Sequence, residues 1–140
     1  MTTTLQRILI YFVVVLFALS CSDYQLHKRI VRAPDIDATP SSYDYGYLNA
    51  DGEVGEIEIT ISNRGNETLE IFEVILSRGV ENFSVGELAM TSLDPDEDTS
   101  LTVSYDPVTY EVNYDEVIII SNDPDERRFI IPLDGAGDAP

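Results

Sequence analysis

The residues best suited to hold a metal ion lie in an acidic stretch in the second half of the chain. Asp94, Asp96 and Asp98 occupy every second position there, and alternating aspartates are how a loop offers oxygen ligands to Ca²⁺. An EF-hand loop beginning at Asp94 would require glycine and glutamate where the sequence has Thr99 and Tyr105. The three aspartates are therefore weak candidates for a Ca²⁺ site, and a solvated acidic loop is the expected structure.

Catalytic arrangements are not predicted. The chain has one histidine, His27, and one cysteine, Cys21, so neither a Ser-His-Asp nor a Cys-His set can form in the body of the protein. Among 26 acidic residues, carboxylate pairs like those of glycosidases arise by chance. The sequence contains no glycine-rich phosphate loop. It therefore predicts a non-enzymatic protein without a cofactor.

The amino terminus has the layout of a secretory signal peptide. Arg7 is followed by the apolar run Ile8–Leu19, which would span about 18 Å as a helix, less than the ~30 Å hydrocarbon core of a bilayer. A positive residue, a short apolar stretch and then small residues are typical of a signal peptide. We expect residues 1–20 to be a signal peptide and not a membrane-spanning helix.

The single cysteine follows this run directly. Ala18-Leu19-Ser20-Cys21 resembles the bacterial lipobox, which implies cleavage between Ser20 and Cys21 and acylation of the cysteine with fatty acids such as palmitate. The sequence departs from the lipobox at Ala18, where leucine is usual, and Ala18 with Ser20 also suits ordinary signal peptidase. A soluble secreted protein is therefore the alternative. We favour the lipoprotein, because an unpaired thiol has little other role in an oxidising compartment. By analogy, Ser22 favours the outer membrane over the inner one.

Charge is unevenly distributed along the chain. Residues 21–34, the acylated terminus and linker, contain Lys28, Arg29 and Arg32 against one acid, whereas residues 35–140 contain 25 acids against four arginines. The formal charge of −18 argues against a nucleic-acid partner, because such binding needs basic residues. The basic linker suits anionic head groups, and an ordinary solvated linker is the alternative.

From residue 35 the apolar residues alternate with polar ones, as in strands with one buried face. The expected strands are 56–62, 68–77, 83–85, 101–105, 117–120 and 128–133. Alternation slips at 72–75, which predicts a bulge or a two-sided strand. Residues 117–120 are apolar throughout, as in a strand covered on both faces, and we expect Ile59 and Ile119 to face the core. Six or seven short strands separated by turns predict an all-β, antiparallel β-sandwich of about seven strands.

Residues at the ends of these strands have local structural explanations. Gly46 and Gly65 suit backbone positions with positive φ. Asn63 and Asn122 can cap turns, and Pro124 can end a strand because it lacks a ladder donor. We interpret these residues as specifying the fold and not as binding a ligand.

Three tyrosines, Tyr43, Tyr45 and Tyr47, alternate with Asp44 and Gly46. Such a stripe could form a recognition face, because tyrosine is common in interfaces. It could also close the open end of the sandwich, which is the interpretation that we favour.

The order of these motifs resembles the hydin-like (ASH) immunoglobulin-like family, which is related to major sperm protein and PapD-type domains. The motifs that carry the resemblance are Tyr43-Asp44-Tyr45-Gly46, Ser62-Asn63-x-Gly65-Asn66, Asn82-Phe83-Ser84, Leu93-Asp94-Pro95, Tyr105-Asp106-Pro107, Ser121-Asn122-Asp123-Pro124 and Leu133-Asp134-Gly135-Ala136-Gly137. The resemblance covers about residues 35–137 and implies an Ig-like sandwich with a structural or protein-binding role and no catalytic site.

These patterns together predict a lipid-anchored Ig-like module of a bacterial envelope, with residues 35–137 as its single domain. Its expected partners are the membrane, through the lipid on Cys21, and another envelope protein, bound through a sheet edge. The alternative is a soluble secreted or periplasmic domain that binds Ca²⁺ or a small ligand through its acidic loops.

Overall fold

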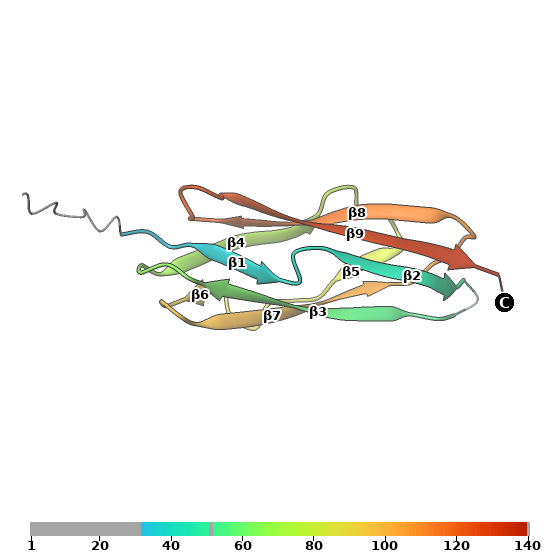
Figure 1. Ribbon diagram of the computed structural model, residues 1–140, viewed down its shortest axis with the longest axis horizontal. Helices are drawn as coiled ribbons and strands as arrows, with labels where there is room; N and C mark the ends of the chain where they lie inside the picture. Colours follow the sequence, from blue (N-terminus) through green and yellow to red (C-terminus); the bar gives the residue numbers. More distant parts are fainter. Residues whose placement is uncertain (1–31, 51, 140) are drawn as a thin grey trace, which may run out of the picture. The chain divides into compact units, whose positions relative to one another are not determined.

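Two β-sheets pack face to face in the computed structural model, which describes residues 32–50 and 52–139 (Figure 1). The strands are β1 (Ile36–Thr39), β2 (Tyr43–Asn49), β3 (Gly55–Asn63), β4 (Leu69–Leu76), β5 (Phe83–Val85), β6 (Ser92–Leu93), β7 (Asp98–Tyr105), β8 (Val112–Ser121) and β9 (Arg128–Asp138). One sheet has the order β1-β3-β7-β5 and the other β2-β9-β8-β4-β6. Within the described part of the chain, no helix could cross a membrane. The signal peptide predicted for 1–20 and the Ser20–Cys21 cleavage site lie outside the described residues.

The all-β sandwich is confirmed, and the described residues form nine strands instead of about seven. The strands added to the expected ranges are β1, β2 and β6, and β6 is too short to show an alternation in the sequence. The chain changes sheets between β1 and β2, at the cis Thr39-Pro40 bond. Because of this change, β1 pairs antiparallel with β3, whereas β2 pairs parallel with β9. The sheets are therefore antiparallel except at this one pair.

The core forms where alternating apolar side chains from the two sheets meet. Ile59 in β3 and Ile119 in β8 both have 0% exposed surface, which confirms that they face the core. Ile59 lies opposite Leu101 in the β3–β7 ladder, so both strands of this pair present apolar residues to the interior. Burial of such side chains stabilises a fold by about 1.5–3 kcal/mol each.

The slip in the alternation of β4 is a bulge. The register of the β4–β8 ladder shifts between Ile71 and Glu73, which confirms the first of the two alternatives. Ile71 faces the core before the bulge, and Val74 and Leu76 pack against the core after it. Phe72 sits at the bulge and is 66% exposed. The extra residue thus keeps both halves of β4 in register with the core.

Two glycines predicted to have positive φ differ in the structure. Gly46 has a φ of +67°, which confirms the prediction for that residue. The prediction for Gly65 is wrong, because Gly65 is not among the described glycines with positive φ. A Cβ atom at Gly65 would lie 2.4 Å from the Ala33 carbonyl oxygen and 2.6 Å from the Asp35 nitrogen. Gly65 is needed for a close approach between two backbone segments, which a turn signal does not reveal.

Candidate interaction surface

The predicted acidic loop connects β6 to β7, and its aspartates have structural contacts. An Oδ atom of Asp94 accepts a hydrogen bond from the Thr68 hydroxyl at 3.0 Å. The Asp96 N–H donates to the Asn63 carbonyl at 3.0 Å, and Asp98 is the first residue of β7. Among the described residues, no group of three or more acidic, histidine or cysteine side chains is arranged to hold a metal ion.

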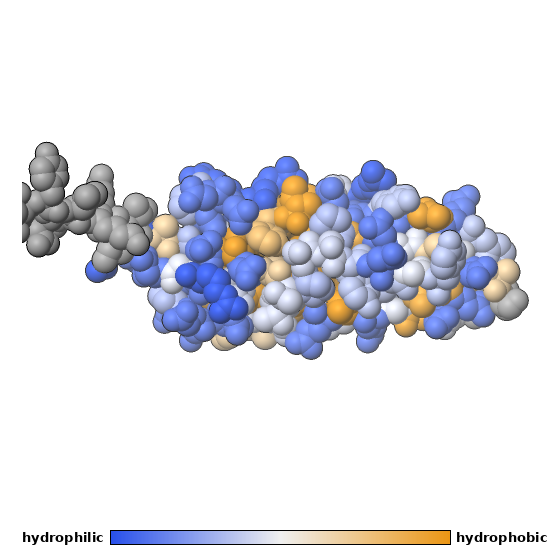
Figure 2. All heavy atoms as spheres, viewed as in Figure 1, coloured by the Kyte–Doolittle hydropathy of each residue, from blue (hydrophilic) through white to orange (hydrophobic). Residues whose placement is uncertain are grey.

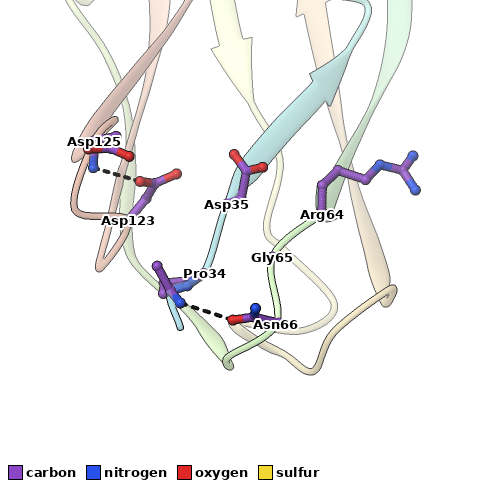
Figure 3. A pocket seen from close by; sticks show the side chains of 8 residues that line it. Pro34, Asp35, Arg64, Gly65, Asn66, Asp123 and Asp125 are labelled. Carbon is purple, nitrogen blue, oxygen red and sulfur yellow. Dashed lines mark hydrogen bonds between the residues drawn. The ribbon is translucent and has the colours of Figure 1, made fainter. Parts of the chain in front are cut away.

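A pocket of about 390 Å³ lies where the described chain begins (Figure 3). It is bounded by Ala33–Asp35, Arg64–Asn66 and two aspartates of the β8–β9 turn, Asp123 and Asp125. The Asn66 side-chain oxygen accepts a hydrogen bond from the Ala33 N–H at 3.0 Å. The Arg64 side chain points away from the two aspartates (Figure 3).

Asp123 is the central polar group of this end of the domain. Its carboxylate accepts hydrogen bonds from the N–H groups of Ile36 at 2.8 Å, Asp125 at 2.8 Å and Glu126 at 3.1 Å. Burial by itself would raise the pKa of Asp123, but these three donors stabilise the ionised form and leave the pKa below its ordinary value. The pocket's polar groups are thus used to fasten residues 33–36 to the domain, in agreement with a fold-specifying role.

The outer faces of the two sheets differ sharply in chemistry. On the four-stranded sheet, the side chains that point away from the core are acidic or hydroxyl-bearing. They are Asp37, Thr39, Glu56, Glu58, Thr60, Ser62, Ser84, Asp98, Ser100, Thr102 and Ser104. None of the large hydrophobic residues that are exposed in the described structure lies on these strands. This is the usual pattern of a sheet with one face in water.

The five-stranded sheet departs from this pattern. Its strands carry six exposed large hydrophobic residues, which are Tyr47, Phe72, Ile75, Val112, Tyr114 and Ile130. Ile75, Ile118 and Ile130 lie side by side on β4, β8 and β9. Ile118 is only 3% exposed although it points outward, because its neighbours cover it. We call the outward-facing Tyr47, Ile75, Val112, Tyr114, Ile118 and Ile130 the apolar face.

Gly46 explains how Tyr47 joins this face. Tyr43 and Tyr45 pack against the core, and the register of β2 against β9 shifts between Asp44 and Tyr47. The shift turns Tyr47 outward, where it lies beside Ala136 and is 77% exposed. The alternation predicted that the three tyrosines form one stripe. In the structure they do not, because Tyr47 faces outward and the other two face inward.

Of the two inward tyrosines, Tyr45 packs against aromatic side chains of the interior. The Tyr45 hydroxyl donates a hydrogen bond to the Val103 carbonyl at 2.8 Å, and its ring centroid lies 5.3 Å from that of Tyr105. Burial raises the pKa of Tyr45 well above its ordinary value, and the nearby Tyr43 and Glu56 raise it further. Tyr45 is therefore neutral at physiological pH, and its hydroxyl is hydrogen-bonded within the fold.

Acidic residues lie among the side chains of the apolar face and beside them. Asp44 and Asp134 are paired across β2 and β9, Glu73 lies one row from Ile75, and Glu116 lies two residues before Ile118 on β8. Among the outward-facing positions of the described strands of this sheet, only Arg128 is basic. The surface thus combines exposed apolar side chains with mainly negative charge interspersed between them.

One feature of the sequence points to this surface, namely the apolar run at residues 117–120. Periodicity alone did not show that one side of this run lies on the outer face of the sheet. Residues 117–120 were expected to be covered on both faces, and Val117, Ile118 and Ile119 are indeed buried. On the outward side, however, the cover comes from neighbouring side chains and not from a second protein layer. In the view of Figure 2, which shows one side of the molecule, hydrophilic residues predominate and hydrophobic ones are scattered.

Comparisons with known proteins identify the fold. The family model of HYDIN/CFA65/VesB-like Ig-like domains matches residues 34–136, which confirms the resemblance seen in the sequence. Among curated proteins, none matches this chain.

Solved structures resemble the chain at low sequence identity. A protein of unknown function from Porphyromonas gingivalis W83 has a TM-score of 0.65 and 21% identity, with 81% of this chain and 51% of that chain covered. The VesB protease of Vibrio cholerae has a TM-score of 0.60 and 16% identity, with 74% and 32% covered. The ASH/PapD-like domain 7 of human CEP192 has a TM-score of 0.55 and 12% identity, with 77% and 88% covered. The chain thus spans about half of the first protein and a third of the protease, and the likeness concerns the fold alone.

Proposed function

We propose that this chain, which belongs to the HYDIN/CFA65/VesB-like family of Ig-like domains, is a non-enzymatic interaction module of a bacterial cell envelope. A lipid on Cys21 would hold it at a membrane, the outer one in preference to the inner one. The apolar face would bind another envelope protein whose contact surface combines apolar and basic side chains.

The observation that carries this proposal is the difference between the two outer faces. The two sheets belong to one sandwich and meet the same solvent, yet of the strands in the described part of the chain only those of the five-stranded sheet carry exposed large hydrophobic residues. Exposed apolar groups that gather on one face of a domain mark interaction sites. The interspersed acidic residues support a partner with positive charge at matching positions.

Other features support a non-catalytic role. The charge of −18 disfavours nucleic acid as the partner. The buried polar side chains of the described residues are used within the fold, as Asp123 illustrates. The VesB protease contains a domain of this fold, but only 32% of that chain is covered, so its protease activity is not carried over. A module attached to a membrane by its amino terminus would leave the rest of its surface open to a partner.

The proposal is tested by isolating the full-length chain from membranes after chemical cross-linking. The double variant Ile75→Thr/Ile130→Thr keeps β-branched residues in β4 and β9 but removes two large apolar side chains of the apolar face. We expect the yield of its cross-linked partner to fall about tenfold or more. The matched control Thr60→Ala/Thr102→Ala changes the opposite outer face and should leave the yield unchanged. Equal yields from the two double variants would contradict the proposal.

A further inference from the structure

A second surface of the domain is the unpaired edge of β4. The sandwich has four sheet edges, and β4 is covered by β6 only at Leu69 and Glu70. Beyond these residues, no strand in the described structure pairs with the segment Phe72–Leu76 on the side away from β8. These five residues extend for about 17 Å, which is long enough to receive another strand.

The backbone of this segment is oriented to accept a strand. The Ser77 N–H donates to the Glu116 carbonyl of β8 at 2.9 Å. Because successive residues of a strand turn their N–H and C=O groups to opposite sides, Ile75 also faces β8, and Val74 and Leu76 face the open side. Val74 and Leu76 thus present two sets of backbone donors and acceptors at the edge.

The other edges are blunted. The edge strand β1 has four residues, lies between Pro34 and Pro40, and its Ile36 N–H is already bound by Asp123. The edge strand β2 is interrupted at Gly46, whose N–H donates to Asp44 at 2.8 Å. On the four-stranded sheet, β5 has only three residues. Short strands, prolines and bulges are how proteins protect edges from pairing, and Phe72–Leu76 has only the bulge at its beginning.

A groove of about 450 Å³ runs beside the unpaired edge. Its apolar lining includes Phe72, Val74, Val85 and Leu88, and Glu73 and Glu87 add negative charge. Phe72, Glu73 and Glu87 are exposed. Pockets for alternate side chains beside a free edge are what strand addition uses for specificity.

We propose that the Phe72–Leu76 edge binds an extended segment of a partner protein in which valine or isoleucine alternates with lysine or arginine. The segment would pair with the backbone of Val74 and Leu76. Its apolar side chains would enter the groove, and its basic side chains would meet Glu73 and Glu87. A second copy of this chain is a poorer occupant, because residues 35–140 of each copy carry 25 acids against four arginines and would repel each other. The inference rests on the proposed interaction role and gives the chemistry of one bound segment.

The test uses the full-length chain in a neutral detergent and a fluorescent peptide in which four lysines alternate with three valines. We expect saturable binding by fluorescence anisotropy, and slower amide hydrogen exchange in Phe72–Leu76 when the peptide is bound. A peptide with glutamate in place of each lysine should not bind. No saturable binding of the lysine peptide, or protection confined to the apolar face, would overturn the proposal.

Two variants test separately the negative charge of the groove and the backbone of the β4 edge. Glu73→Lys/Glu87→Lys should weaken binding about tenfold or more, whereas the control Glu56→Lys/Glu58→Lys, with the same charge change on the opposite sheet, should weaken it much less. Equal weakening by the two double variants would overturn the site. Val74→Pro should abolish binding, because it removes a backbone N–H that faces the open side of β4 and does not change the charge of the groove. Val74 packs against the core and is not part of the apolar face, so Val74→Pro, which leaves Ile75 and Ile130 intact, distinguishes loss of peptide binding from loss of the membrane partner.

Discussion

Replacing Asp123 with asparagine should weaken the whole domain and change its response to acid. One carboxylate oxygen accepts the Ile36 N–H, and the other accepts those of Asp125 and Glu126. The side chain belongs to a residue with only 2% exposed surface. In Asp123→Asn, an NH₂ group must occupy one of these positions and face a donor. Hydrogen bonds to charged groups contribute about 1.5–3 kcal/mol each, so we expect a loss of about 2–4 kcal/mol in the free energy of unfolding at neutral pH.

The pH dependence of this loss follows from the pKa of Asp123. Three backbone donors hold it below its ordinary value of 3.8 in the folded protein, against the opposing effect of burial. A lowered folded pKa stabilises the fold at pH values above the unfolded pKa, and this stabilisation is lost as the pH falls through the folded pKa. The difference between wild type and Asp123→Asn should therefore be largest at neutral pH and shrink below about pH 4.

The assay is urea unfolding of the full-length chain in neutral detergent, followed by circular dichroism at several pH values. Asp125→Asn is the matched control, because Asp125 is exposed and its backbone N–H, not its carboxylate, contacts Asp123. The control should change the free energy of unfolding by less than about 0.5 kcal/mol. A loss below about 1 kcal/mol for Asp123→Asn at neutral pH, or a loss that does not shrink in acid, would refute the reasoning.

Four further predictions concern the core, a close backbone contact, the anchor and the acidic loop. Ile59→Ala and Ile119→Ala should each lower the free energy of unfolding by about 2–5 kcal/mol in urea titrations, and less than about 1 kcal/mol for both would mean that their burial is misjudged. Gly65→Ala should lower the midpoint of thermal unfolding, because its Cβ would overlap the backbone of the 33–35 segment; an unchanged midpoint would contradict the close approach. Cys21→Ser should move the chain from the membrane to the soluble fraction, and an unmodified Cys21 in mass spectra of the wild type would refute the anchor. Millimolar Ca²⁺ and Mg²⁺ should shift the melting temperature equally, whereas a saturable, Ca²⁺-specific shift removed by Asp96→Asn would reveal a calcium site.

Much of the sandwich could be predicted from the sequence because burial imposes a period of two. The alternation around Ile59 and the apolar run around Ile119 placed both residues in the core correctly. The slip after Ile71 predicted a bulge as one of two outcomes, and the register shift confirms it. These features are local, so the sequence carries them directly.

The remaining features depend on contacts between distant segments. The close approach of Gly65 to Ala33 and Asp35 joins positions about thirty residues apart, and alternation says nothing about such pairs. The position of β2 beside β9 depends on a change of sheet, which local patterns do not encode. Tyr47 faces outward only because the bulge at Gly46 reverses the alternation. The apolar face was therefore not predictable as a surface, although several of its residues stood out as apolar.

The most direct test of the central claim is photo-cross-linking in intact cells from single positions on the two outer faces. A benzoylphenylalanine at Ile130 lies on the apolar face, and one at Thr102 lies on the polar outer face of the other sheet. The proposed function predicts a protein adduct of one defined size from Ile130, whose partner is an envelope protein by mass spectrometry, and no such adduct from Thr102. The same adduct from both positions, or from Thr102 alone, would contradict it.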